Sequence, residues 1–335
     1  MKTIILAAAL AVACAGAARA QTPRAPLSLV IGTSAGGGYD LYGRLAARHL
    51  GRFLPGEPQV VPSNMPGAGQ LILANWLYAV APRDGSTIGQ VPSTTAFDGL
   101  FGNAQAHYDA TKFNWIGSLD GYITVAAVWA DSPIKTAADF LTKKVVLGGG
   151  APASDVTIWP KLVNSLLGAK LEIVSGYVGT AQITLAIERG EVQGMLGADW
   201  HGIELSKPDW VRDRKIRIVM QFVGERSADL PDTPTSSEFV RDPRAAEILK
   251  LFYARQLYGR PLAAPPGTPP AKIAELRAAF WAMAHDAAFL ADAAKLGAVV
   301  DAARGEDIQA LAEKVYATPK ELIAQAADEL RRASR

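Results

Sequence analysis

Three consecutive glycines at 36–38, followed by Asp40, are the residues with the clearest capacity for ligand chemistry. They stand between an apolar run at 27–31 and a helical pattern at 40–52. Glycine allows positive φ angles and a close approach to the backbone, and the free N–H groups and dipole of a helix start favour bound negative charge. The pattern predicts an anion-binding loop between a strand and a helix.

Comparable polar loops follow other expected strands. Glycine-containing loops lie at 62–69, 148–155 and 177–180, each before a helical pattern. Ser93 and Thr94 follow the strand expected at 87–91. In open α/β sheets, ligands bind outside the carboxyl ends of the strands. These loops are therefore predicted to line one crevice, although turn and helix-cap chemistry also explains each loop taken alone.

The elements that must position these loops alternate along the chain. This alternation predicts an α/β fold with largely parallel sheets, and the chain is too long for one compact core, so two lobes are expected. A Pro-rich segment at 260–270 introduces an Ala- and Leu-rich helical third, 271–296 and 306–333. The expected strands are 27–31, 59–62, 87–91, 123–129, 144–147, 171–175, 192–196 and 216–222, and the expected helices between them are 40–52, 69–80, 136–142, 155–167 and 180–189.

The first twenty residues have the pattern of a secretory signal peptide. Lys2 supplies a positive start, residues 4–13 form a short apolar run, and Ala18-Arg19-Ala20 is an A-x-A cleavage site. Cleavage before Gln21 is predicted, so the folded part is expected to work outside the cytoplasm. Lipoprotein processing at Cys14 is the alternative.

Charge and composition exclude several classes of partner. Loss of residues 1–20 removes Lys2 and Arg19, so the 34 basic residues fall to the number of acidic ones, 32. A neutral chain argues against nucleic acid or an anionic membrane as partner. The one cysteine lies in the signal segment, so no disulfide is expected. No later run approaches 18 apolar residues, so none is expected to span a bilayer.

An enzymatic alternative lies in the first loop. Residues 32–36, GTSAG, match the G-x-S-x-G nucleophile elbow, with Ser34 as nucleophile and either Asp199 with His201 or a distant acid with His285 to complete a triad. A hydrolase nucleophile normally follows several strands, whereas Ser34 follows one. No catalytic residue is therefore predicted, and replacing Ser34 by Ala distinguishes an esterase from a binding protein.

Metal and nucleotide chemistry have little support in the pattern. The four histidines are scattered, and His201 with Glu204 is the one close pair, which a solvated loop explains better because a metal normally needs three or more ligands. Neither a P-loop nor a complete G-x-G-x-x-G is present. The prediction is a protein without metal or cofactor.

A series of motifs along the mature chain resembles the periplasmic solute-binding receptors of tripartite tricarboxylate transporters, the Bug or TctC-like family. The motifs occur in the family's order and span essentially the whole mature chain. They are 35–40 with Arg44, 64–69, 82–87, 176–180 with 188–192, Arg226 with 230–235 and Glu238, and 259–261 with 264–267.

The resemblance implies a type II periplasmic-binding-protein fold, with two Rossmann-like lobes joined by a two-strand hinge. Lobe I would hold 21–123 and 225–335, and lobe II would hold 124–224, with crossings near 120–126 and 220–226. It further implies a monomer that closes around a small organic carboxylate, without catalysis, and delivers it to a large and a small membrane subunit. A receptor that presents its ligand to a sensory system is the alternative.

The loops and the resemblance together predict the ligand contacts. Thr33-Ser34-Ala35 stands where the family has aromatic and proline residues, and Tyr39 replaces a small Thr. Asp155 is expected to cap a helix and face away, the alternative being contact with an amino or hydroxyl group. Trp200 is expected on the ligand wall, with a core position as the alternative. The predicted contacts are Thr33, Ser34, Gly37, Gly38, Tyr39, Asp40, Gly67, Ala68, Ser93, Thr94, Gly150, Ala151, Ser154, Gly179, Thr180, Asp199 and Trp200.

Overall fold

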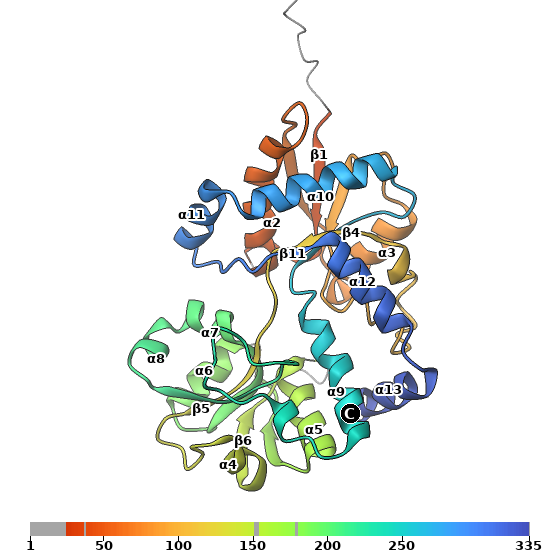
Figure 1. The fold of residues 1–335 in the computed structure, drawn as a ribbon. Coiled ribbons are helices and arrows are strands. Elements are labelled where there is room, and N and C mark those ends of the chain that lie inside the picture. Colours follow the sequence, from red (N-terminus) through yellow and green to blue (C-terminus); the bar gives the residue numbers. More distant parts are fainter. Residues whose placement is uncertain (1–24, 37, 151–153, 178–179, 335) are drawn as a thin grey trace, which may run out of the picture.

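The computed structural model describes residues 25–36, 38–150, 154–177 and 180–334, which form two lobes around two separate sheets (Figure 1). The first sheet has the order β11-β4-β10-β3-β1-β2 and the second has the order β7-β6-β8-β5-β9. The predicted α/β class is confirmed. The strands are β1 (Leu27–Ile31), β2 (Val60–Asn64), β3 (Thr87–Gln90), β4 (Asn114–Ser118), β5 (Thr124–Trp129), β6 (Lys144–Gly148), β7 (Lys170–Val174), β8 (Gly194–Asp199), β9 (Ile216–Gln221), β10 (Pro261–Ala264) and β11 (Ala303–Arg304).

Both sheets are mixed, whereas the sequence predicted largely parallel ones. In the first sheet β1 pairs in parallel with β2 and β3, but β10 is antiparallel to both β3 and β4. In the second sheet β5 is antiparallel to both β8 and β9. The chain enters β5 and β10 directly from the opposite lobe. These strands therefore begin at the sheet edge where their neighbours end, and they run the opposite way.

Helices cover both faces of the first sheet, because alternate residues of a strand point to opposite faces. In β1, Leu29 and Ile31 join the apolar cluster that contains the α2, α10 and α11 side chains, whereas Val30 joins the cluster of α3 and α12. The helices of this lobe are α2 (Gly38–Leu50), α3 (Leu71–Ala79), α10 (Pro270–Ala284), α11 (Ala287–Lys295) and α12 (Gly305–Tyr316).

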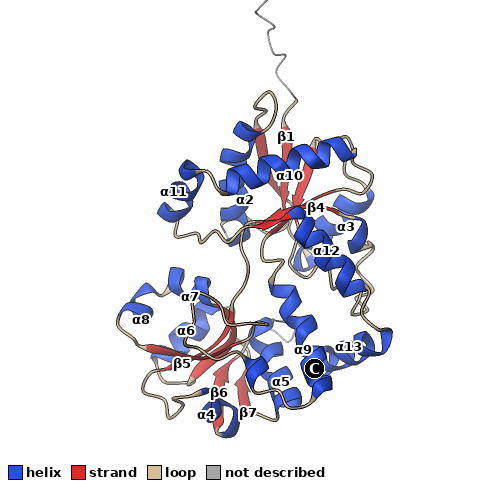
Figure 2. Ribbon diagram, viewed as in Figure 1, coloured by secondary structure: helices blue, strands red, loops and turns tan. Residues whose placement is uncertain are grey.

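The second sheet is covered in the same way (Figure 2). Ala126 and Val128 of β5 face a cluster that includes α5 side chains, and Val125 and Ala127 face the cluster of α6 and α7. Within the described residues, no helix is long and apolar enough to cross a membrane. The helices around this sheet are α4 (Ala137–Thr142), α5 (Asp155–Leu167), α6 (Thr180–Glu188), α7 (Trp200–Ser206), α8 (Pro208–Arg212), α9 (Pro243–Gln256) and α13 (Lys320–Ser334), and short 3-10 turns lie at Gly51–Phe53, Ala68–Gln70, Ala110–Lys112 and Ser236–Glu238.

Helices α9 and α13 follow the second sheet in the chain and pack against it. Leu249 and Phe252 of α9 and Ala326 of α13 belong to the apolar cluster of that lobe. Val223 and Phe239 also pack there, so the chain stays with the second lobe past 220–226, where the resemblance placed the return crossing. Helices α9 and α13 therefore pack with the second lobe, although the resemblance assigned all of 225–335 to lobe I. Helix α9 was not among the expected helices, although Asp242 before Pro243 is a helix-start signal.

The lobes are joined by residues 119–123, which lead from β4 to β5, and by residues 257–260, which lead from α9 to β10. The two segments run against each other. The Tyr122 N–H donates to the Gln256 carbonyl at 3.0 Å, and the Ser118 hydroxyl donates to the carbonyls of Asp120 and Tyr258 at 2.9 and 2.8 Å. A third connection, 317–319, leads from α12 to α13.

Gly259 permits the closest approach between the crossing segments. Its φ is +34°, and a Cβ at this position would lie 1.5 Å from the Asp120 carbonyl oxygen. A separation this short is impossible without moving backbone. Glycine is therefore required here by both conformation and space.

We expect Gly259→Ala to destabilise the protein by more than about 3 kcal/mol, because the crossing segments must separate. Gly190→Ala is the matched control, since Gly190 also has a positive φ, +72°, but open space around it. The control should lose about 1–2 kcal/mol from the backbone conformation alone. Urea unfolding of both variants measures the difference, and equal losses would contradict the steric argument.

Candidate functional site

Asp40 organises the first glycine loop from inside. Its carboxylate is buried and accepts hydrogen bonds from the Gly36 N–H at 2.9 Å, Arg44 Nε at 2.9 Å and Asn64 Nδ2 at 2.8 Å. Asn64 Nδ2 also donates to the Thr33 carbonyl at 2.8 Å. Burial raises the pKa of Asp40, but these hydrogen bonds outweigh burial and hold the pKa below its ordinary value. The carboxylate predicted as a ligand contact thus holds the loop in shape.

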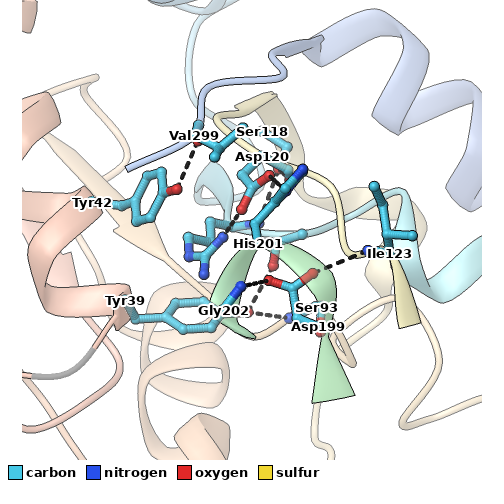
Figure 3. A network of polar contacts seen from close by, with 12 residues as sticks. Tyr39, Tyr42, Ser93, Ser118, Asp120, Ile123, Asp199, His201, Gly202 and Val299 are labelled. Atoms are coloured by element: carbon cyan, nitrogen blue, oxygen red, sulfur yellow. Dashed lines mark hydrogen bonds and ion pairs between the residues drawn. The ribbon is translucent and has the colours of Figure 1, made fainter. Parts of the chain in front are cut away.

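Tyr39 links the first loop to the crossing segments. Its hydroxyl donates to the Gly259 carbonyl at 2.8 Å and accepts from the Ser93 N–H at 3.1 Å (Figure 3). One side chain therefore ties together the start of α2, the loop after β3 and the 257–260 segment. A threonine, which the family has at this position, is too short to make both of these contacts.

A cavity of about 180 Å³ lies where the two lobes meet. The first lobe contributes Ser93, the crossing segment contributes Tyr122, and the second lobe contributes side chains from β5, β8, α5 and α9. It therefore combines loops at the carboxyl ends of strands from both sheets, as ligand sites of open α/β folds do. Its lining is Ser93, Tyr122, Thr124, Asp155, Trp159, Gly197, Asp199, Arg255 and Gln256.

Arg255 is the cationic group of this cavity, and it was not among the predicted ligand contacts. It lies in the last turn of α9, and its guanidinium donates to the Asp155 carboxylate. Its side chain is 17% exposed. Burial lowers the pKa of Arg255, but the charge and hydrogen bond of Asp155 raise it above its ordinary value, so the guanidinium stays charged. The cavity therefore presents a fixed positive charge paired with a carboxylate.

Asp155 departs from the predicted role as a cap that faces away. Ser154 occupies the N-cap position of α5, and Asp155 is the first residue of the helix. Its carboxylate lines the cavity and pairs with Arg255 from another helix. The tertiary contact with α9 draws it inward, and a single-helix pattern does not contain that information.

Asp199 lines the cavity, whereas Trp200 does not. The Asp199 carboxylate caps α7, accepting the Gly202 N–H at 3.1 Å, and also accepts the Ile123 N–H at 3.1 Å. Burial raises the pKa of Asp199, and these two N–H groups and His201 offset part of the rise. Trp200 is 8% exposed and packs in the apolar cluster with Ile203 and Trp210. It is a core residue rather than a ligand wall.

Several other predicted contacts have local structural roles. Thr94 donates its hydroxyl to Asp98 at 3.0 Å, and the Ser154 hydroxyl donates to Thr157 at 3.2 Å. Ser34, Gly38, Gly67, Ala68 and Thr180 are exposed, Thr33 is half-buried and Gly150 is buried. Gly37, Ala151 and Gly179 lie outside the described residues. For these positions ligand contact stays a prediction.

A buried ion pair lies on the same crossing segments that bring Tyr122 to the cavity. Arg260 donates to the Asp120 carboxylate, and the Arg260 and Asp120 side chains are 11% and 0% exposed. The guanidinium carbon lies 4.1 Å from the centre of the Tyr42 ring and 5.2 Å from that of Tyr122. A cation stacked on aromatic faces and paired with a carboxylate tolerates burial. The pair joins the two crossing segments.

A larger groove of about 640 Å³ lies between α9, α12 and α13. Its floor is formed by apolar side chains, among them Leu251, Leu311 and Leu322, and Lys250 and Lys314 also line it. It has no convergent set of polar groups at strand ends. The smaller cavity is therefore the better candidate for a polar ligand.

The histidines proposed for a hydrolase triad have other partners. His201 Nε2 lies 3.1 Å from Asp229 Oδ2, and His285 Nδ1 lies 2.9 Å from the Trp281 carbonyl oxygen. Ser34 is exposed on the first loop. The contacts of both rings are therefore explained without a catalytic role.

A model of the family described as tripartite tricarboxylate transporter family receptor matches residues 44–327. The chain belongs to this receptor family. Within the match, Arg44 orders the first loop and Arg255 and Asp199 line the cavity. The resemblance stated from the motifs is confirmed.

Individual proteins agree with this membership. A UPF0065 protein encoded in the gbd 5′ region of Cupriavidus necator is 31% identical over 231 residues, and the match covers 64% of each chain. A TctC solute-binding protein from Polaromonas has a TM-score of 0.70 at 21% identity, covering 90% of this chain and 99% of that one. An R. palustris protein solved with adipate has a TM-score of 0.63 at 21% identity, covering 91% and 98%. The predicted type II periplasmic-binding-protein fold is confirmed.

We expect Asp40→Asn to destabilise the protein by about 1.5–3 kcal/mol at pH 7, through loss of charge-assisted hydrogen bonds. Because the folded pKa is depressed, this stabilisation is fully present above the ordinary aspartate pKa of about 3.9. It is lost as the pH falls through the folded pKa.

Unfolding free energies measured from pH 7 down to pH 3 should therefore show the variant and the parent protein converging. Asp131→Asn, at an exposed position, is the control and should differ little at any pH. A constant gap between the Asp40→Asn variant and the parent across this range would contradict a role for the ionised carboxylate.

Proposed function

We propose that this receptor captures a small organic carboxylate between its two lobes in the periplasm and delivers it to the membrane subunits of a tripartite tricarboxylate-type transporter. The observation that carries the proposal is the cavity of about 180 Å³, lined from both lobes and holding the Arg255 guanidinium. A guanidinium binds a carboxylate through parallel N–H donors. A cavity of this size suits a small metabolite.

Closure of the lobes is the proposed mechanism. The cavity walls come from separate lobes joined by the segments 119–123, 257–260 and 317–319, so a hinge motion at these connections would change the distance between the walls. A ligand that contacts both walls stabilises the closed form by its differential affinity. Binding of this kind needs no covalent chemistry.

Family membership and fold support the transport partner. The matched family is named for receptors of tripartite tricarboxylate transporters, and such receptors are periplasmic. The R. palustris neighbour was solved with adipate, a dicarboxylate. Presentation of the ligand to a sensor remains the second candidate, because a closed form can be recognised by either kind of partner.

The Asp155–Arg255 pair makes the ligand site testable. We expect Arg255→Gln to weaken binding of the best carboxylate about 10- to 100-fold, because a charge-assisted contact is lost. Asp155→Asn should strengthen binding, because it frees the guanidinium and removes a like charge from the cavity. Lys250→Gln is the matched control, since it removes a positive charge from an exposed position of the same helix.

Calorimetric titration of residues 21–335 with citrate, malate, adipate, aromatic carboxylates and amino acids measures these affinities. Lys250→Gln should bind like the parent protein. Unchanged affinity in Arg255→Gln would show that the guanidinium does not contact the ligand. Absence of binding by the whole panel would overturn the proposed ligand class.

A separate measurement tests the absence of catalysis. We expect the purified protein to release no nitrophenol from p-nitrophenyl acetate beyond the rate in buffer. Any turnover that Ser34→Ala abolishes would establish the esterase instead. Reduced carboxylate affinity in Ser34→Ala without turnover would place the hydroxyl in the binding loop.

A further inference from the structure

Two buried polar atoms, one from Asp120 and one from His201, lie opposite each other beside the cavity. Asp120 Oδ1 and His201 Nδ1 are 3.7 Å apart, and their side chains are 0% and 8% exposed. Among the described residues, no group donates a hydrogen bond to either atom. An unpartnered buried polar atom costs free energy, so the pair requires an explanation.

When His201 is neutral, the other contacts of the two residues leave a lone pair on each of these atoms. Asp120 accepts from Arg260 through its second oxygen, Oδ2. His201 Nε2 lies 3.1 Å from Asp229 Oδ2. A carboxylate accepts hydrogen bonds, so the ring proton of a neutral imidazole lies on Nε2 and leaves Nδ1 as a bare acceptor. With His201 in this neutral form, two acceptors point at one another.

Asp199 completes a set of three possible ligands. One oxygen of Asp120, one of Asp199 and a ring nitrogen of His201 all lie within 4.8 Å of one another (Figure 3). The Ile123 and Gly202 N–H groups orient the Asp199 carboxylate from both sides. At metal–ligand distances of about 2.1 Å, neighbouring ligands of a tetrahedral ion are roughly 3.4 Å apart. Binding a metal would therefore require the three side chains to move closer together than they are in this structure.

The surroundings of the histidine also suit a metal ligand. A histidine that binds a metal through one nitrogen usually donates its other N–H to a carboxylate, and Asp229 occupies that position. Asp120, Asp199 and Asp229 with Arg260 leave two negative charges in excess. Glu204, the partner suggested by sequence spacing, is outside the set of three.

We propose that Asp120, Asp199 and His201 bind a divalent transition-metal cation. Two carboxylate oxygens and an imidazole nitrogen suit Zn²⁺, Mn²⁺ or Co²⁺ better than Ca²⁺, which prefers oxygen alone. Zn²⁺ is the strongest fit, because three protein ligands leave a fourth position of a tetrahedral site open. The metal would connect α7 of the second lobe to the 119–123 crossing segment.

The site has a consequence for the cavity that rests on the proposed carboxylate function. Asp199 belongs to both, so a bound cation would neutralise an acidic wall next to Arg255. Carboxylate affinity should then rise with the cation present. The existence of the cation site does not depend on this coupling.

Calorimetric titration of tag-free, EDTA-stripped protein with Zn²⁺ tests the site directly, without any carboxylate. One equivalent should bind per chain, and Co²⁺ in its place should develop visible d–d absorption. Asp229→Asn should weaken binding about 10- to 100-fold, as expected for a residue that positions a ligand. His201→Gln, which retains a donor near Asp229 and loses Nδ1, should weaken it further.

His49→Gln is the matched control, because His49 Nε2 makes the same contact to a carboxylate, 3.0 Å from Asp292 Oδ2. It should bind Zn²⁺ like the parent protein. Circular dichroism melting verifies that each variant is folded. Absence of stoichiometric Zn²⁺ and Co²⁺ binding, or unchanged binding in His201→Gln, would overturn the proposal. So would ¹⁵N NMR of stripped protein that shows both His201 nitrogens protonated and unchanged by Zn²⁺.

Discussion

The close contact between the two segments that cross from lobe to lobe is the constraint on which the remaining structure depends. Backbone meets backbone at Gly259 and Asp120, so closely that a side chain at 259 has no room. The Arg260–Asp120 ion pair joins the same two segments. A buried ion pair offsets its desolvation only when the geometry is well satisfied, and here Tyr42 and Tyr122 cover the guanidinium. The pair therefore fixes where the lobes meet.

Several side chains that line the cavity come from this junction between the lobes. The segment 119–123 contributes Tyr122, and α9 enters the junction with Arg255 and Gln256 at its end. Carboxylates from the second lobe surround that single cation, so the cavity is less positive than a simple anion trap. If the proposed carboxylate ligand binds here, this balance favours selection by the ligand's other groups, and the proposed metal beside Asp199 would make the cavity more favourable to anions.

The C-terminal part of the chain connects the lobes more extensively than a two-strand hinge. Helix α9 packs against the second lobe and reaches the cavity, and α13 returns to that lobe after α12 has packed on the first sheet. A change in lobe separation must therefore be accommodated at three connections. The apolar groove between α9, α12 and α13 lies among these connections.

Local pattern alone was sufficient for the α/β class, the bounds of strand β1 and the family motifs, because strand alternation, helix periodicity and glycine turns depend on neighbours in sequence. Strands β4 and β10 and helix α9 were missed, and with them Arg255. Its role arises from Asp155, which is 100 residues away. Long-range contacts also decided three other side chains: Asp40 holds the first loop, Trp200 packs in the apolar core, and His201 faces Asp120. Which polar groups meet across two lobes depends on long-range packing, and local spacing carries no record of it.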